Sequence, residues 1–190
     1  MNVENYRAAA RRWWRQEIRP LLILALVMCS LRSSLADWND VPTGSMKPTI
    51  LEGDRVFVNK LAYDLKVPFT TWHITEWSNP QRGDIVVFFS PQDGTRLVKR
   101  VIGLPGDTVY IDAGQVYVNG RLLTESYVPE DYRDRVSWEE HRIPPGEYFV
   151  LGDHRSSSSD SRTWGFVKRE KIYGKAVFVY WPLKNIGRLR

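Results

Sequence analysis

The hydrophobic residues of this chain form one continuous run near the N-terminus and a series of short segments after it. The continuous run, residues 20–31, contains no charged side chain and lies between Arg19 and Arg32. Beyond residue 37, apolar residues recur in short stretches typical of β-strands, and no stretch of a dozen residues has the helical period. The pattern therefore predicts one N-terminal helix followed by an all-β region.

The predicted strands are short and are separated by turn residues. They cover residues 55–60, 84–89, 96–104, 108–111, 115–118, 147–151 and 172–181. Asp112-Ala113-Gly114 and Asn119-Gly120 have the turn chemistry of β-hairpins. Residues 61–82 and 124–146 contain proline and lack a strand pattern, so they are predicted as loops. This organisation indicates a compact, mostly antiparallel β-barrel or β-sandwich.

The apolar run has three interpretations, and a transmembrane anchor helix over residues 17–36 is the preferred one. The run is short for a spanning helix, which needs about 20 residues, but Arg19 and Arg32 can extend their charged ends to the membrane interfaces. Trp14 and Trp38 are separated by about 36 Å along a helix. This spacing would place the two tryptophans near opposite interfaces.

Two alternatives to an anchor remain open. A cleaved secretory signal is one, because basic residues precede the run and Ser34-Leu35-Ala36 follows it in the pattern of a cleavage site. A buried core helix is the other, and the arginines before the run argue against it. The preferred division is a basic cytoplasmic N-terminus at 1–16, the anchor at 17–36 and an extracytoplasmic β-domain at 37–190.

Charge and composition narrow the expected partners. The 190 residues carry a net charge of +5, but the lysines and arginines are scattered and do not form the basic stripe typical of nucleic-acid binding. We therefore expect no nucleic acid and a weak attraction to anionic membrane surfaces. The single cysteine, Cys29, excludes an intramolecular disulfide. The three histidines have no metal-ligand spacing, so no metal ion is expected.

The first candidate for chemistry is Ser45, which lies in the segment Pro42-Thr43-Gly44-Ser45-Met46-Lys47-Pro48-Thr49. Its prolines and glycine predict irregular backbone. A serine presented on such a turn becomes a nucleophile when a base takes its proton. Considered alone, Ser45 would be an ordinary turn serine, because serine is common in turns.

The candidate base lies in the predicted strand at 96–104, where Lys99 and Arg100 are flanked by aliphatic residues on either face. An arginine stays protonated in proteins and cannot act as a base. A lysine walled in by Leu97 and Val101 would have a lowered pKa and a neutral amine near pH 7 to 8. Lys99 is therefore the better candidate. The simpler alternative is an edge-strand lysine with its amine in water.

A third segment, residues 152–162, is rich in serine. A hydroxyl from it could orient a neutral lysine without restoring the charge, and Asp160 and Arg162 could pair to brace it. Asp153-His154 raises the alternative of a Ser-His-Asp site, which we disfavour because neighbours on a backbone often point apart. A solvated serine-rich turn is the simplest alternative.

Together these segments resemble the bacterial type I signal peptidases, which are membrane-anchored Ser/Lys endopeptidases. The similarity runs from about residue 38 to 182 in four blocks that follow the family's order. The blocks are Gly44-Ser45-Met46 with Pro48-Thr49, Arg82-Gly83-Asp84-Ile85-Val86-Val87-Phe88, Lys99 through Asp107, and Gly152-Asp153-His154 through Arg162. His154 stands where the family often has asparagine, and it is not expected to be catalytic. The segment 121–146 is short, so the second, larger β-domain of some relatives is expected to be missing.

The resemblance implies roles for specific residues. Ser45 would be the nucleophile, Lys99 the general base, and Ser158 the residue that orients the lysine amine. The oxyanion hole would combine the Ser45 N–H with the hydroxyl of Thr43, where the family often has serine. The residues expected to support the site or to line the substrate pocket are Asp160, Arg162, Val41, Pro42, Met46, Ile50 and Val98.

The resemblance also implies a function, that of signal peptidase I. The enzyme would remove signal peptides from secretory preproteins after an Ala-X-Ala-like motif, through an acyl-enzyme and without a cofactor. It would lie in the inner (cytoplasmic) membrane as a single-pass protein, with the N-terminus cytoplasmic, the catalytic domain periplasmic and the lipid bilayer as a second partner. Trp72 and Trp77 would either touch the bilayer surface or pack in the body.

There are three rival functions, two of them other Ser/Lys proteases and the third a protein without enzymatic activity. Conjugation-pilus peptidases would share the fold and the dyad and are not excluded. Self-cleaving repressor-type proteases are disfavoured, because they need a DNA-binding helical domain where this chain has an apolar segment. A non-enzymatic exported β-domain that binds a partner is the third alternative.

Overall fold

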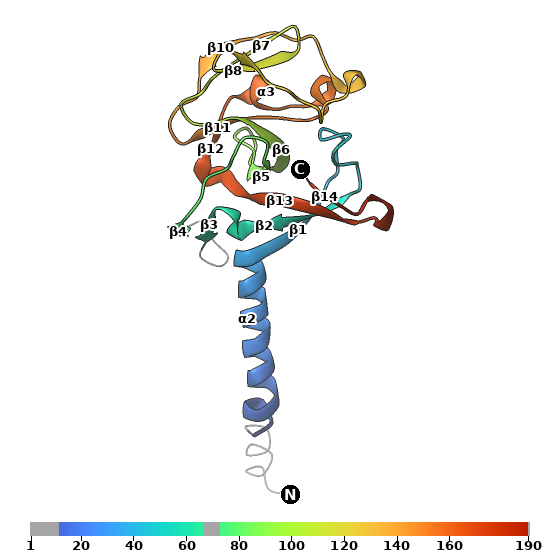
Figure 1. Cartoon of the computed structure of the whole chain (residues 1–190). Helices are drawn as coiled ribbons and strands as arrows, with labels where there is room; N and C mark the ends of the chain where they lie inside the picture. Colours follow the sequence, from blue (N-terminus) through green and yellow to red (C-terminus); the bar gives the residue numbers. More distant parts are fainter. Residues whose placement is uncertain (1–11, 67–72, 190) are drawn as a thin grey trace, which may run out of the picture.

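The described part of the chain, residues 12–66 and 73–189 of a computed structural model, consists of a long N-terminal helix and a β-rich body (Figure 1). Most of the predicted cytoplasmic segment at 1–16 and also Trp72 lie outside the described residues. The helix and the body are joined without a linker, because α2 ends at Leu35 and β1 begins at Ala36.

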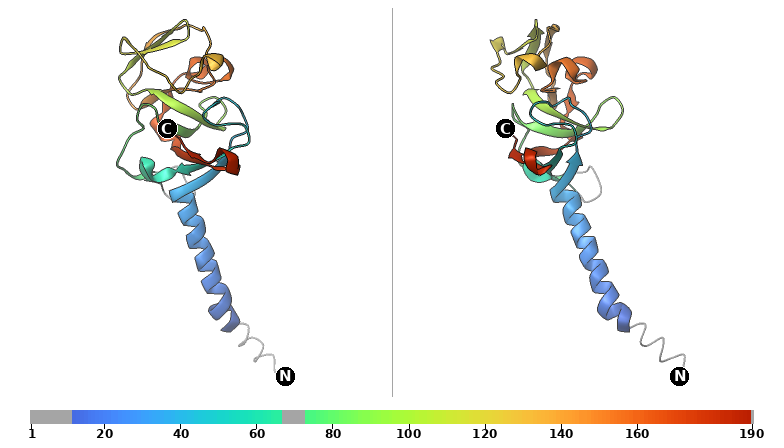
Figure 2. Two further views of the ribbon diagram at one scale, coloured as in Figure 1. Left: turned by 45° about the vertical axis from the view of Figure 1, so that its right-hand side comes forward. Right: turned by 90° about the vertical axis from the view of Figure 1, so that its right-hand side faces the viewer.

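The N-terminal helix combines η1 (Trp14–Ile18) with α2 (Arg19–Leu35) and stands away from the body in every view (Figure 1 and Figure 2). The side chains of residues 21–24, all leucine or isoleucine, are 52–62% exposed. This exposure rules out the buried core helix. Across residues 12–66 and 73–189, no helix is both long and apolar enough to cross a membrane.

The main sheet has eight strands in the order β1-β2-β13-β5-β6-β11-β12, with β14 paired to β13. All of its pairings are antiparallel. The bounds are β1 (Ala36–Asp40), β2 (Arg55–Asn59), β13 (Ile172–Trp181), β5 (Ile85–Phe89), β6 (Arg96–Gly103), β11 (Glu147–Leu151), β12 (Val167–Lys168) and β14 (Gly187–Arg188). β2 alternates between exposed and buried positions because one of its faces covers the core. β5 is apolar throughout because nearly all of its residues are buried.

A smaller sheet follows the order β10-β7-β8-β9, and β3 pairs with β4. The bounds are β10 (Trp138–Arg142), β7 (Thr108–Asp112), β8 (Gln115–Val118), β9 (Arg121–Leu122), β3 (Asp64–Lys66) and β4 (His73–Glu76). The short helical segments are η2 (Lys60–Ala62), η3 (Glu130–Tyr132), η4 (Arg155–Ser157), α3 (Ser161–Trp164), η5 (Arg169–Lys171) and η6 (Leu183–Asn185). The smaller sheet forms the end of the body that lies farthest from α2 (Figure 1).

The mostly antiparallel β architecture is confirmed, whereas the closed barrel is wrong. β1 and β12, the two ends of the main sheet's path, are not paired with each other. The path ends in a strand of two residues, which offers few ladder hydrogen bonds, and the chain between β6 and β11 leaves to build the smaller sheet. The segments predicted as loops also contain β3, β4 and β10, because short pairings of polar residues carry no apolar pattern.

Candidate active site

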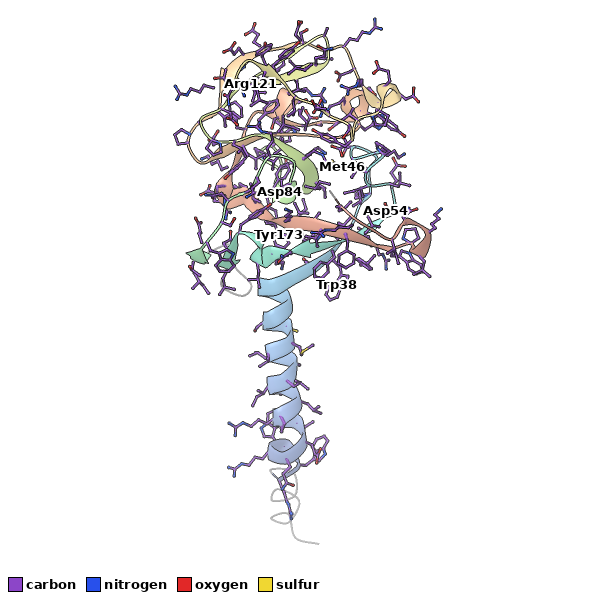
Figure 3. The ribbon with its side chains drawn as sticks, viewed as in Figure 1. Trp38, Met46, Asp54, Asp84, Arg121 and Tyr173 are labelled. Carbon is purple, nitrogen blue, oxygen red and sulfur yellow. The ribbon has the colours of Figure 1, made fainter. Side chains whose placement is uncertain are left out.

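Ser45 lies on the irregular segment between β1 and β2, and its neighbours fasten that segment to the core. A hydrogen bond from Lys47 N–H to Gly44 O, 3.1 Å long, closes the turn around it. Figure 3 shows Met46 between this segment and β6. The side chains of the segment that are buried in the core are Val41, Met46 and Ile50. Ser45 is therefore held in a fixed, half-buried position.

Lys99 reaches Ser45 from the middle of β6. Its side chain is 2% exposed, and its Nζ lies 2.7 Å from Ser45 Oγ, within hydrogen-bonding distance. Burial lowers the pKa of Lys99 to about 8, although the carboxylates of Asp160 and Asp153 act in the opposite direction. No ion pair to Lys99 is found in the described part of the chain. About a tenth of the amine is therefore neutral at pH 7.

Arg100 points to the other face of the same strand. Its Nε and Nη2 donate hydrogen bonds of 2.9 and 2.7 Å to the two carboxylate oxygens of Asp153, and both side chains are fully buried. The Thr49 hydroxyl also donates to Asp153. This pair joins β6 to the loop after β11 and to the Ser45 segment. It therefore holds three parts of the site together.

The loop after β11 approaches Ser45 at Gly152. A Cβ at Gly152 would lie 2.2 Å from Ser158 Oγ and 2.5 Å from Ser45 O, so only glycine fits there. Ser158 Oγ is buried and has no hydrogen-bond partner among residues 12–66 and 73–189. The structure thus brings Ser158 next to the dyad, while the predicted hydrogen bond from Ser158 to the Lys99 amine is not formed.

The predicted pairing of Asp160 with Arg162 is confirmed. Arg162 Nε and Nη2 each donate to Asp160 at 2.8 Å, and Asp160 in turn accepts from the Gly152 N–H at 3.1 Å. Arg162 also pairs with Asp134 near the smaller sheet. The carboxylate of Asp160 therefore ties the serine-rich loop to the residue that touches Ser45.

His154 does not serve as the base in this arrangement. Its Nδ1 lies 3.2 Å from Gly44 O, while the carboxylate of Asp153 is engaged by Arg100. Ser45 Oγ is hydrogen-bonded to Lys99 Nζ and not to His154. The geometry therefore disfavours the Ser-His-Asp alternative.

A small pocket of about 80 Å³ opens beside Ser45 and Lys99. Of the residues predicted to line it, Val41, Pro42, Met46 and Val98 do so, and Thr43 is also at its wall. Ile50 is not part of the lining, because its side chain is fully buried in the core. Lining residues that the sequence did not indicate are Asn39, Asp40, Val87, Arg96 and Leu97.

The prediction from the sequence did not include a buried ion pair between Arg155 and Glu125. The guanidinium of Arg155 donates two hydrogen bonds to the Glu125 carboxylate and one of 3.0 Å to Gly152 O. The hydroxyl of Tyr127 donates to the same carboxylate at 2.9 Å, and its ring lies 4.0 Å from the Arg100 guanidinium. No local pattern marks Glu125, since its partner is 30 positions away.

In residues 12–66 and 73–189, no three His, Cys, Asp or Glu side chains gather closely enough to hold a metal ion. The arrangement at Ser45 places a hydroxyl, which is a potential nucleophile, against a buried amine, which is a potential base. Such a pair can carry out acyl transfer through a covalent intermediate.

Comparison with known proteins identifies the class. The chain matches the family model described as signal peptidase, peptidase S26, over residues 14–181. The chain therefore belongs to this family, whose members are serine peptidases.

The similar curated proteins carry a more particular name. Probable signal peptidase I-2 of Synechocystis is 35% identical, and the match covers 93% of this chain and 77% of that protein. Signal peptidase I of Pseudomonas aeruginosa is 37% identical with 90% and 73% covered, and that of Bacillus caldolyticus is 37% identical with 93% of each chain covered. A solved signal peptidase I from Enterococcus faecalis is 40% identical, with a TM-score of 0.46 over 52% of this chain and 97% of that one.

Proposed function

We propose that this chain is a signal peptidase I, a serine endopeptidase that removes signal peptides from exported preproteins with Ser45 as nucleophile and Lys99 as general base. The observation that carries the proposal is the 2.7 Å contact between Ser45 Oγ and a buried Lys99 amine with a pKa lowered to about 8. The family assignment supports the same activity. The Ser/Lys mechanism is typical of this family.

In the proposed reaction the neutral Lys99 amine accepts the Ser45 proton while Ser45 Oγ attacks the scissile carbonyl carbon. The carbonyl oxygen becomes an oxyanion, which accepts hydrogen bonds from the Ser45 N–H and the Thr43 hydroxyl. The Lys99 ammonium then protonates the leaving amine, and the C–N bond breaks to give the acyl-enzyme. A water molecule then gives a proton to Lys99 and attacks the ester carbon of the acyl-enzyme. The bond from that carbon to Ser45 Oγ breaks, Lys99 returns the proton to Oγ, and the signal peptide leaves with a free carboxyl group.

Several features suit an extended substrate. The pocket is walled on one side by residues 39–43, which include the last two residues of β1 and the three that follow it, and on the other by residues 96–99 of β6. β1 pairs only with β2 among the described strands, so a peptide could lie along this seam as an added strand. Alternate side chains would then point into the pocket, and its small volume of about 80 Å³ favours small residues before the cleaved bond.

We further propose that α2 anchors the chain in the inner membrane. Apolar side chains of α2 are exposed between Leu21 and Met28, and three aromatic residues of the main sheet add to the apolar surface. Trp38, Phe57 and Phe178 are cross-strand neighbours on β1, β2 and β13 and therefore share one face. Figure 3 shows Trp38 on the side of the sheet that faces α2.

This proposal places residues 1–16 in the cytoplasm, 17–36 in the bilayer and the catalytic body, 37–190, in the periplasm. Trp77 is 53% exposed and is available to the bilayer surface. Ala36 is held in β1 opposite Asn59. Since cleavage after Ala36 would require this strand to leave the sheet, we favour an anchor that is retained.

The decisive experiment is cleavage of a labelled preprotein with an Ala-X-Ala signal by the full chain in detergent. Ser45→Ala and Lys99→Ala should each abolish cleavage, whereas Ser156→Ala and Lys168→Ala, which change exposed residues of the same types, should cut at the wild-type rate. A wild type that leaves several preproteins intact would reject the function. An active Lys99→Ala would reject the base but keep the enzyme.

A further inference from the structure

His154 contacts the nucleophile segment in two places. Its backbone N–H donates a 3.1 Å hydrogen bond to Ser45 O, and its ring Nδ1 lies 3.2 Å from Gly44 O. A carbonyl oxygen can only accept, so Nδ1 carries the proton in this contact. One residue of the loop after β11 thus holds the carbonyl groups on both sides of the Ser45 Cα.

The carbonyl of Gly44 and the N–H of Ser45 belong to the same planar peptide unit. A hydrogen bond accepted by Gly44 O therefore fixes the plane in which the Ser45 N–H points, and it polarises that N–H as a donor. The Lys47 N–H bonds the same oxygen at 3.1 Å from within the turn. His154 supplies the only contact to Gly44 O that comes from outside the turn among the described residues.

We propose that His154 is a positioning residue for the oxyanion hole, acting through the Gly44–Ser45 peptide. The inference rests on the proposed function, in which the Ser45 N–H stabilises the oxyanion. It assigns His154 no proton transfer and no contact with substrate. Its contribution is confined to the transition states and the tetrahedral intermediate, because the substrate carries an oxyanion only there and not in the ground state.

The His154 ring also packs edge-on against Tyr132 of η3, with the ring centroids 4.7 Å apart. Donor and packing roles must therefore be separated. Asparagine keeps an N–H donor of similar reach but loses the ring. Phenylalanine keeps a ring for Tyr132 but has no donor, and alanine has neither.

The experiment measures kcat and KM of the full chain in detergent for the three substitutions of His154. We expect His154→Phe and His154→Ala to lower kcat about tenfold, less than the 10² to 10³ that follows complete loss of an oxyanion donor. KM should stay within about twofold, and His154→Asn should recover most of the loss. The acid limb of the pH profile should keep its midpoint, because Lys99 is unchanged.

A second readout uses a peptide aldehyde, which adds to Ser45 Oγ and places an oxygen where the oxyanion forms. Its inhibition constant should weaken about tenfold in His154→Phe and His154→Ala. The matching peptide alcohol, which forms no adduct, should bind all variants equally.

Different results would overturn different claims. If wild type cuts, Ser45→Ala is inactive, and His154→Phe keeps its kcat, the positioning role is wrong while the function stands. If His154→Asn loses as much kcat as His154→Ala while His154→Phe stays active, the aromatic ring is what matters. His154 then acts only through packing on Tyr132, and the positioning role is wrong. An inactive wild type would overturn both proposals.

Discussion

Lys99 and Arg100 are adjacent cations on β6 that are buried to the same degree, 2% and 1% exposed, yet they have opposite surroundings. Lys99 faces the Ser45 hydroxyl, whereas Arg100 is bound through two hydrogen bonds to the Asp153 carboxylate. The strand's alternation separates them, because consecutive side chains point to opposite faces.

Under the proposed mechanism, β6 contributes one cation to catalysis and the next to structure. Arg100 cannot lose its proton, so burying it requires a carboxylate partner with matched geometry. Lys99 can become neutral, so it can be buried beside a hydroxyl, and this burial is what lowers its pKa to about 8. The comparison can be tested by changing each cation separately.

The largest expected effect is on activity. Lys99→Met should lower kcat/KM by at least about 10³-fold, because the Ser45 proton then has no acceptor. Cleavage of an Ala-X-Ala preprotein measures the loss. Retention of most activity would mean that another group serves as the base.

The pH dependence of kcat/KM of the wild type should also identify Lys99 as the base. Since the neutral amine is the active form and the pKa is about 8, kcat/KM should fall about tenfold per unit below that pH, or about 10³-fold by pH 5. Tryptophan fluorescence at pH 5 would establish that the protein is still folded. A full rate at pH 5 is incompatible with a lysine base.

Arg100→Met should mainly reduce stability. The Asp153 carboxylate would be left buried without its partner, which costs about 3 to 5 kcal/mol. Urea unfolding of the full chain in detergent measures the change in the free energy of unfolding. The double variant Arg100→Met/Asp153→Leu should recover much of it, and a single variant within about 1 kcal/mol of wild type would contradict the buried pair's role.

Lys99→Met should raise the free energy of unfolding, whereas Arg100→Met lowers it. This is the smallest of the expected effects. Folding lowers the pKa of Lys99 from 10.5 to about 8, so the unfolded chain binds more protons between these values. The cost of burying Lys99 is therefore complete below about pH 8 and disappears above about pH 10.5. We expect a gain on the order of 1 to 3 kcal/mol at pH 7.

Urea unfolding at pH 7 and pH 10 tests this prediction, and the gain should shrink at the higher pH. A variant less stable than wild type at pH 7 would show that the hydrogen bond to Ser45 outweighs the cost of burial.

Several elements could be predicted because their signals are local. The continuous apolar run of β5 and the hairpin turn between β7 and β8 mark strands in the sequence itself. The pairing of Asp160 with Arg162 was also accessible, since the two lie two positions apart. In contrast, β1 was missed, because its sequence Ala-Asp-Trp-Asn-Asp has no apolar alternation.

Other features depend on contacts between distant segments. Ile50 was expected in the substrate pocket, but its side chain turns into the core with β2 and β13. Ser158 lies beside Gly152 without bonding Lys99. The predicted barrel is wrong for a similar reason. Whether the two edges of a sheet pair depends on the twist of the whole sheet, which no local segment of sequence specifies.

The amino-acid sequence identifies the residues that are chemically able to act: a serine on an irregular turn, and a lysine whose neighbour, an arginine, cannot be a base. The tertiary structure alone decided that these two residues meet, at 2.7 Å across 54 positions of chain. It also decided which buried charges find partners, as Arg155 does in Glu125. The physical reason is that pKa values and ion pairs depend on burial and distance, which only the folded chain defines.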